Sequence, residues 1–250
     1  TANAAGLRVA LWHTPYLEPN AGALRQEADT NGYFPVTSGV QLNRWSSPLD
    51  FTNPAADAFW RRNLLAYRAL GIEGFKLDFA EDVVAGLSGS RGNWTFFDGS
   101  TEKTMHAQYT RLYHRAYRAT LGDLDGFLIA RAGKWGSQQT GLVIWPGDID
   151  ATLTKFAEAF TDRSGKRVVG VGGLPSAVRA GQSLSMSGFP FFGADTGGYR
   201  HSPPDKETFM RWVSQSALST VMQTGDSSSQ PPWVFNAENG RDDEAIEGMP

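Results

Sequence analysis

The feature that most constrains the fold is an alternation of short apolar runs with segments of helical periodicity. Apolar runs, each followed by a polar loop, lie at residues 7–12, 74–79, 126–130, 141–145 and 189–192. Apolar residues at helical spacing lie at 53–70, 103–119, 176–186 and 207–222. Strands that alternate with helices in this way form βα units with parallel strands. The sequence therefore predicts an α/β fold built on a parallel sheet.

The first long helix has clear signals at both of its ends. Asn53 is a residue type that caps helices, and Pro54 fits the first helical position. Gly71 follows the last apolar residue of the pattern and fits the position where a helix ends. These signals predict a helix over 53–70.

Polar residues occur where four of the predicted strands end. They are Asp78, Arg131, Asp148 and Asp195. In an α/β barrel the carboxyl ends of the strands meet at one face, and active sites are built there. We therefore expect these four side chains to belong to a functional site.

Asp78 is the best candidate for an ionised carboxylate that attacks a substrate. Lys76 precedes it by two positions, so both side chains point to the same face of an extended strand. A neighbouring ammonium group stabilises the charged form that a nucleophile requires. A structural ion pair between Lys76 and Asp78 explains the same spacing equally well.

Asp148 is the candidate for a proton donor. It follows a turn formed by Pro146 and Gly147, and Trp145 could provide an apolar wall that keeps a nearby acid protonated. The alternative is that Asp148 or Asp150 caps a helix that begins near residue 151. Spacing alone favours this capping role.

Two more polar residues are candidates for binding a polar ligand. Arg131 follows a strand without other charges, where a guanidinium group can hold a carboxylate or sugar hydroxyls. Asp195 lies in the glycine-rich sequence GADTGGY at 193–199, where it can accept hydrogen bonds from hydroxyl groups or form an Asx turn.

Composition excludes several other functions. A net charge of −3 and a pI near 5.8 argue against nucleic acid and anionic membranes as partners and favour a neutral ligand. Cysteine is absent, and the four histidines lack metal-ligand spacing, so no metal or other cofactor is expected. The glycine-rich sequence GVGG at 170–173 lacks the Lys-Ser/Thr ending of a phosphate loop. Aromatic residues make up 12% of the chain, which suits stacking on sugar rings.

Taken together, these segments resemble glycoside hydrolase family 31, the retaining α-glucosidases, α-xylosidases and their relatives. Residues 74–81 (GFKLDFAE) resemble the nucleophile segment of the family, and residues 145–148 (WPGD) resemble its acid/base segment. Similar segments, in the order of the family, lie at 9–16, 131–133 and 181–199. The resemblance spans roughly residues 7–212.

The resemblance implies an α/β fold of the (β/α)8 TIM-barrel type that is incomplete, because the early strands of the family barrel are missing. We expect residues 1–250 to form one partial catalytic domain, with further domains elsewhere in the parent chain. The sequence does not specify the compartment in which the protein works. The Arg-x-His motif that the family carries near its last strand is not found, and Asp226 lies in that region. This departure leaves the identity of the sugar open.

By resemblance, Asp78 is the nucleophile and Asp148 the general acid/base of a double displacement on a neutral α-linked sugar. Glu81 and Asp82 are rival nucleophiles on chemical grounds alone. The residues expected to bind the sugar are Trp12, Lys76, Arg131, Trp145, Asp195 and Asp226. A transglycosylase with the same site and a non-catalytic carbohydrate-binding barrel are the alternatives.

Overall fold

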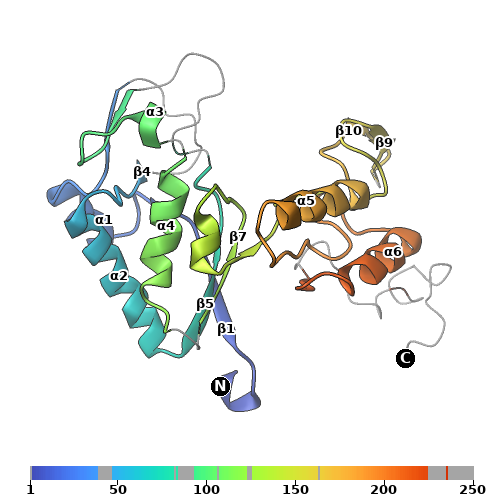
Figure 1. The fold of residues 1–250 in the computed structure, drawn as a ribbon, viewed down its shortest axis with the longest axis horizontal. Coiled ribbons are helices and arrows are strands. Elements are labelled where there is room, and N and C mark those ends of the chain that lie inside the picture. The colour runs from blue at the N-terminus through green and yellow to red at the C-terminus, as the bar shows by residue number, and fades with distance from the viewer. Residues whose placement is uncertain are drawn as a thin grey trace. The chain divides into compact units, whose positions relative to one another are not determined.

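The chain forms two compact units of mixed helices and strands. The computed structural model describes residues 2–38, 47–81, 83, 93–105, 107–122, 126–162, 164–224 and 235. The first unit spans Thr1–Leu142 and the second spans Val143–Pro250. Both units contain helices and strands (Figure 1), so the predicted α/β class is confirmed.

A parallel sheet is the centre of the first unit. Strand β5 (Ile72–Leu77) lies between β1 (Val9–His13) and β7 (Phe127–Ala130), and both neighbours run parallel to it. The register places Trp12 of β1 and Ile129 of β7 on either side of Lys76. The strands predicted at 7–12, 74–79 and 126–130 are thus confirmed, with small shifts of their ends.

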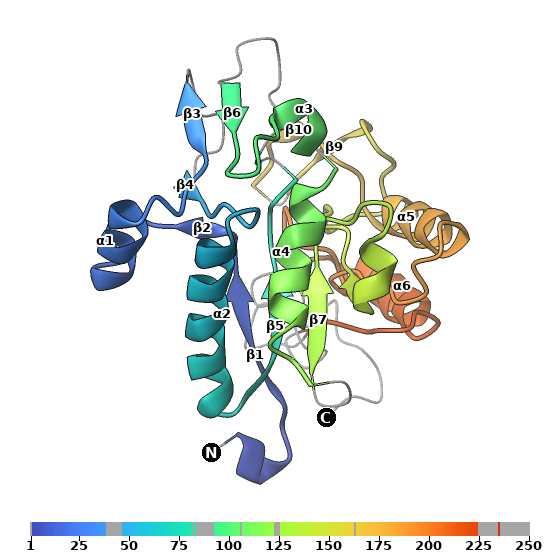
Figure 2. The ribbon, with the colours of Figure 1, turned by 60° about the vertical axis from the view of Figure 1, so that its left-hand side comes forward.

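Helices α2 (Pro54–Ala69) and α4 (Tyr109–Arg118) cover one face of this sheet (Figure 2). Helix α2 begins as the sequence predicts, because the Asn53 side chain accepts a hydrogen bond of 2.9 Å from the backbone N–H of Ala55. It ends before Gly71, whose φ of 91° is in the left-handed region that favours glycine.

The helix predicted at 103–119 is interrupted. The structure has a short helix α3 (Glu102–Met105) followed by α4, and the N–H of Gln108 closes a turn onto the carbonyl of Met105 at 2.9 Å. Periodicity does not reveal this break, because the buried residues Met105 and Tyr109 keep a spacing of four across it.

The two faces of the sheet differ in burial. Phe75 and Leu77 of β5 are fully buried and pack toward the helices, where Tyr113 and Tyr117 of α4 complete an aromatic core. Lys76 points to the opposite face, as alternation along a strand requires. On that face the side chain of Trp12 remains 51% exposed.

Smaller elements fill the connections of the first unit. Strands β2 (Tyr16–Leu17) and β4 (Ser47–Pro48) form one antiparallel pair, and β3 (Val36–Ser38) and β6 (Asn93–Thr95) form another. The remaining elements are α1 (Ala23–Thr30) and the 3-10 turns η1 (Asn3–Ala5) and η2 (Ser137–Thr140).

The described part of the second unit contains two helices and a β-hairpin. Helices α5 (Leu174–Met186) and α6 (Lys206–Ser216) are in contact, and β9 (Ala159–Thr161) pairs antiparallel with β10 (Arg167–Val169). Strand β8 (Val143–Ile144) lies within the strand predicted at 141–145. Its Ile144 forms a parallel bridge with Phe192, and this bridge is what the structure shows of the strand predicted at 189–192. The core residues are Ile149, Ala177, Phe192, Ala194 and Trp212.

Candidate active site

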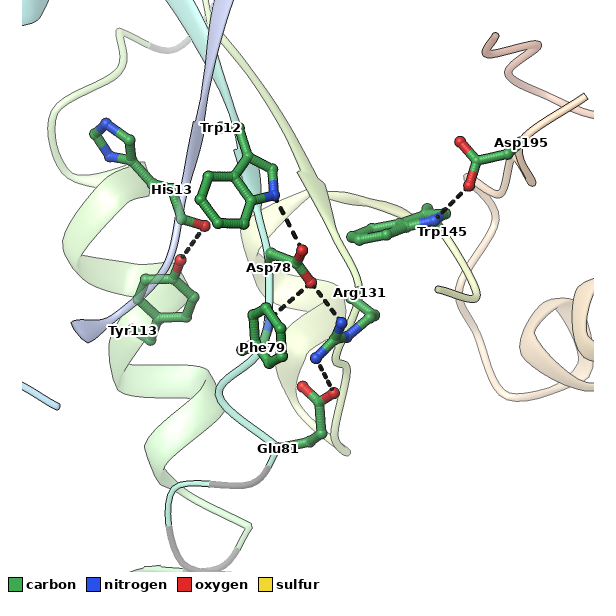
Figure 3. A network of polar contacts seen from close by, with 9 residues as sticks. All are labelled: Trp12, His13, Asp78, Phe79, Glu81, Tyr113, Arg131, Trp145 and Asp195. Atoms are coloured by element: carbon green, nitrogen blue, oxygen red, sulfur yellow. Dashed lines mark hydrogen bonds and ion pairs between the residues drawn. The ribbon is translucent and has the colours of Figure 1, made fainter. Parts of the chain in front are cut away.

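Asp78 follows the last residue of β5, and three hydrogen-bond donors hold its carboxylate (Figure 3). Trp12 Nε1 donates to Oδ2 at 3.0 Å, and Arg131 Nη1 lies 2.8 Å from Oδ1. The N–H of Phe79 donates to Oδ1 at 2.8 Å. Asp78 is only 7% exposed, so these charge-assisted contacts fix the direction in which the carboxylate points.

Arg131 holds the loop that follows Asp78. Its Nη2 lies 2.5 Å from Oε1 of Glu81, and its guanidinium group lies 3.9 Å from the centre of the Phe79 ring. Phe79 and Ala80 have φ values of 58° and 81°, in the left-handed region that non-glycine residues rarely adopt. This turn places both the ring of Phe79 and the carboxylate of Glu81 around the guanidinium group (Figure 3).

The structure thus brings together three predicted site residues of the first unit, Trp12, Asp78 and Arg131. Lys76, the fourth, lies beside Trp12 in the sheet register and on the same face as Asp78. The ion pair described at Asp78 is with Arg131, which comes from the neighbouring strand. Glu81, weighed above as a rival nucleophile, is a partner of Arg131, and Asp82 lies outside the described residues.

The backbone of His13 supports Asp78 from the adjacent strand. Its carbonyl accepts hydrogen bonds from the N–H of Asp78 at 2.8 Å and from the hydroxyl of Tyr113 at 3.1 Å. The His13 ring lies on the helical side of the sheet, 2.9 Å from the hydroxyl of Tyr117, and burial lowers its pKa to about 4. His13 is therefore neutral at physiological pH, and its ring packs against the aromatic rings of Phe75 and Tyr117.

In the second unit, Trp145 and Asp195 form a buried pair. Trp145 Nε1 donates to Oδ2 of Asp195 at 3.0 Å, and the two residues are 2% and 4% exposed (Figure 3). Because Asp195 also forms a parallel bridge with Gln223, it is fixed by the fold on both sides. The carboxylate of Asp195 is therefore held in one position by its surroundings.

Asp148 is exposed, beyond a turn in which Gly147 has a φ of 83°. The capping role considered for Asp148 and Asp150 is wrong, because no helix begins near residue 151 in the described part of the chain. The next helix, α5, begins at Leu174. Asp226 lies outside the residues that the structure describes.

Asp150 is a residue whose role the sequence did not indicate. It is fully buried, and its Oδ2 accepts a hydrogen bond of 2.9 Å from the N–H of Gly172. Its Oδ1 faces Arg200 Nε at 3.7 Å and His201 Nε2 at 3.6 Å. Asp150 therefore joins the loop after Asp148 to two segments that are distant in the sequence.

The glycines at 170–173 make this junction possible. A Cβ added to Gly170 would lie 2.0 Å from Oδ2 of Asp150, and one added to Gly173 would lie 1.8 Å from the carbonyl oxygen of Thr152. Close backbone approach, and not phosphate binding, accounts for these two glycines. They are a feature of the sequence that could have pointed to a close backbone approach here, but the sequence does not show that the partner is Asp150.

The described residues contain no group of three or more His, Asp or Glu side chains that could hold a metal ion. Within the same ranges, no helix is both long and apolar enough to cross a membrane.

Comparison with known proteins gives matches over nearly the whole chain. The family model of the glycosyl hydrolases family 31 TIM-barrel domain matches residues 1–246. An alpha-xylosidase of Emericella nidulans is 30% identical over 244 residues, which are 93% of this chain and 28% of the relative. An isomaltosyltransferase of Sporosarcina globispora is 27% identical over 260 residues, which cover 94% of this chain and 22% of the relative.

A solved structure supports the same fold. The chain resembles a family 31 sulfoquinovosidase from E. rectale in complex with an aza-sugar inhibitor, with a TM-score of 0.72 and 25% identity. The match covers 96% of this chain and 35% of that structure. The predicted TIM-barrel class is therefore confirmed. The chain spans only about a fifth to a third of the lengths of these three proteins.

Proposed function

The chain belongs to glycoside hydrolase family 31, and from this membership we propose that it carries the catalytic pair of a retaining α-glycosidase. Asp78 is the nucleophile in this proposal, and Asp148 is the general acid/base. The assignment of the pair rests on the order of the family's segments in the sequence. We further propose that the two compact units belong to one catalytic domain.

The observation that carries the proposal is the environment of Asp78. Trp12 holds one carboxylate oxygen and Arg131 the other, at the carboxyl end of the middle strand. Each carboxylate oxygen has two lone pairs, and Trp12 is the one described donor to Oδ2. Oδ2 can therefore attack an anomeric carbon while both neighbours keep the carboxylate in place.

The mechanism is a double displacement. Asp78 Oδ2 forms a bond to the anomeric carbon as the glycosidic bond breaks, and Asp148 gives its proton to the leaving oxygen. Asp148 then removes a proton from water, whose oxygen displaces Asp78 and releases the sugar with its configuration retained. Arg131, Trp145 and Asp195 are proposed to contact the cleaved sugar, and Trp12 and Lys76 to flank it.

The experiment replaces each aspartate with alanine in the full-length protein and adds azide. Each variant should lose activity on an aryl α-glycoside by on the order of 10³-fold or more. With Asp78→Ala, azide attacks the substrate directly and should give the β-glycosyl azide. With Asp148→Ala, azide attacks the glycosyl-enzyme and should give the α-glycosyl azide.

Asp29→Asn is the matched control, because Asp29 is a carboxylate in a surface ion pair with Arg25, at 2.8 Å. It should leave the rate unchanged. Full activity of Asp78→Ala, or the same azide anomer from both variants, would show that the roles are wrongly assigned.

Transfer to an acceptor sugar is the second candidate, because one relative is an isomaltosyltransferase. Hydrolase and transferase share the glycosyl-enzyme and differ in whether water or a sugar hydroxyl receives the glycosyl group. A time course with added acceptor separates them. Transfer products that outpace hydrolysis would identify a transglycosylase.

A further inference from the structure

A cavity lies entirely within the second unit, and the proposed function assigns no role to it. Its volume is about 270 Å³, and it is lined by residues of three segments, 151–154, 160–162 and 201–208. Ligand pockets begin at about 300 Å³, so this space suits one small ring and not a long chain.

Hydroxyl groups and carboxylates dominate the polar part of the lining. Four threonines contribute hydroxyl groups, and Phe160 and Pro203 contribute apolar surface. Among the described residues that line the cavity there is neither lysine nor arginine. A lining that offers hydroxyls, carboxylates and an aromatic ring is suited to a neutral polyol and repels an anion.

Each of the two carboxylates has one oxygen engaged by the fold. Asp162 Oδ1 accepts hydrogen bonds from the N–H groups of Ser164 and Lys166, at 3.0 and 2.9 Å, which fix the turn of the hairpin. Asp205 Oδ1 caps α6 by accepting from the N–H of Thr208 at 2.7 Å. The second oxygen of each has no hydrogen-bond partner among the described residues, so both can accept hydrogen bonds from a ligand.

His201 fixes the wall between these carboxylates. Its Nδ1 lies 3.8 Å from Asp162 Oδ2, and its Nε2 lies 3.6 Å from Oδ1 of the buried Asp150. The Phe160 ring packs against the His201 ring edge-on, at 5.2 Å and 85°. The position of the wall is therefore set by contacts on both sides of the histidine.

Some of the residues that line the cavity follow closely after Asp148 in the sequence, and Asp148 is the proposed acid/base residue. The first lining residue, Ala151, is three positions after Asp148. The N–H of Ala151 donates to the carbonyl of Arg200 at 2.7 Å, which ties this loop to the loop of His201. One stretch of backbone thus carries both the acid/base residue and part of the cavity.

We propose that this cavity binds a neutral sugar unit on the leaving-group side of the scissile bond. The unit is either part of the substrate beyond the cleaved sugar or the acceptor that receives the glycosyl group. This inference rests on the proposed function, because it assigns a ligand to a cavity on the same loop as the proposed acid/base residue Asp148. The hydroxyl groups of this sugar unit donate hydrogen bonds to Asp162 and Asp205.

The test is a calorimetric titration of the full-length protein in an Asp78→Asn background, so that the ligand is not turned over. The probes are methyl α-glucoside, the disaccharides maltose, isomaltose and nigerose, and maltobionate, which is maltose with its reducing-end carbon oxidised to a carboxylate. Asp162→Asn keeps an acceptor for the hairpin turn but removes the charge. It should weaken the tightest disaccharide by about fivefold or more, since charged acceptors form hydrogen bonds roughly twice as strong as neutral ones.

Binding of methyl α-glucoside should not change, because it has no second sugar unit. Maltobionate should bind more weakly than maltose, because its carboxylate is repelled by the carboxylates of the cavity. Asp162→Asn removes one of these charges, so the difference in affinity between the two ligands should become smaller. Asp98→Asn is the matched control, because Asp98 Oδ1 accepts from the N–H of Ser100 at 2.9 Å in a similar turn of the first unit. It should change none of these affinities.

Equal affinities in Asp162→Asn and Asp98→Asn for every probe would overturn the proposal. So would disaccharides that bind no more tightly than methyl α-glucoside. Failure of the proposed function is a separate result, because it would appear in the azide experiment as the opposite anomer of the glycosyl azide. The binding affinities measured in this titration could still be interpreted.

Discussion

Replacing His114 with leucine should make the protein less sensitive to acid. His114 lies on the buried face of α4 and is fully buried. Neither of its ring nitrogens has a hydrogen-bond partner among the residues that the structure describes. Burial lowers the pKa of His114 from 6.5 to about 3, because the charged ring would lose its hydration.

The sign of the effect follows from the two pKa values. Below pH 6.5 the unfolded chain binds a proton at this histidine, and the folded protein does not do so until about pH 3. Stability is therefore lost as the pH falls through this window. At pH 5 the loss is about 2 kcal/mol, since each pH unit below the unfolded pKa costs about 1.4 kcal/mol. Leucine has a similar size and does not titrate, so it removes this loss.

The assay is thermal unfolding of the wild type and His114→Leu at pH 7.5 and pH 5. The wild type should lose about 4–8 °C more than the variant between the two conditions. Thr110→Val is the control, because Thr110 is a buried polar residue of the same helix that does not titrate. It can change stability but should keep the pH dependence of the wild type. Equal losses in the wild type and His114→Leu would refute the reasoning.

Two further predictions concern the site and its support. Trp12→Phe removes the hydrogen bond to Asp78 Oδ2, so kcat/KM should fall about tenfold or more, and unchanged steady-state kinetics would contradict this role. Gly173→Ala places a Cβ 1.8 Å from the carbonyl oxygen of Thr152 and should destabilise the protein by about 1–3 kcal/mol in denaturant unfolding. Gly122→Ala, where a Cβ meets no atom of the described residues within 4 Å, is its control and should be nearly neutral.

Local patterns were sufficient to predict the sheet and the longest helix. Strand β5 and helix α2 follow from alternation, from the cap at Asn53 and from Gly71, all of which act within a few residues. The position of Asp78 and Arg131 at adjacent strand ends follows from the parallel order of the strands. The pairing of Trp12 with Asp78 did not follow, because it depends on the register of two strands that are 66 positions apart.

The support around Asp150 could not be predicted, because its partners are distant in the sequence. Its hydrogen bond to Gly172 joins residues 22 positions apart, and His201 is more distant still. An aspartate that caps a helix and an aspartate that is buried between distant segments can have the same neighbours in the sequence. Only the packing of the glycines at 170–173 against this loop distinguishes them.

The left-handed turn after Asp78 has a consequence for how this sequence can evolve. A non-glycine residue with a positive φ costs about 1–2 kcal/mol, and both Phe79 and Ala80 adopt one. Any alanine codon becomes a glycine codon through one base change. A substitution that removes the backbone strain at position 80 therefore requires only a single mutation. Glycine would also make the unfolded chain more flexible and the turn less rigid. Selection for a relaxed backbone and selection for a fixed turn therefore favour different residues at this single codon.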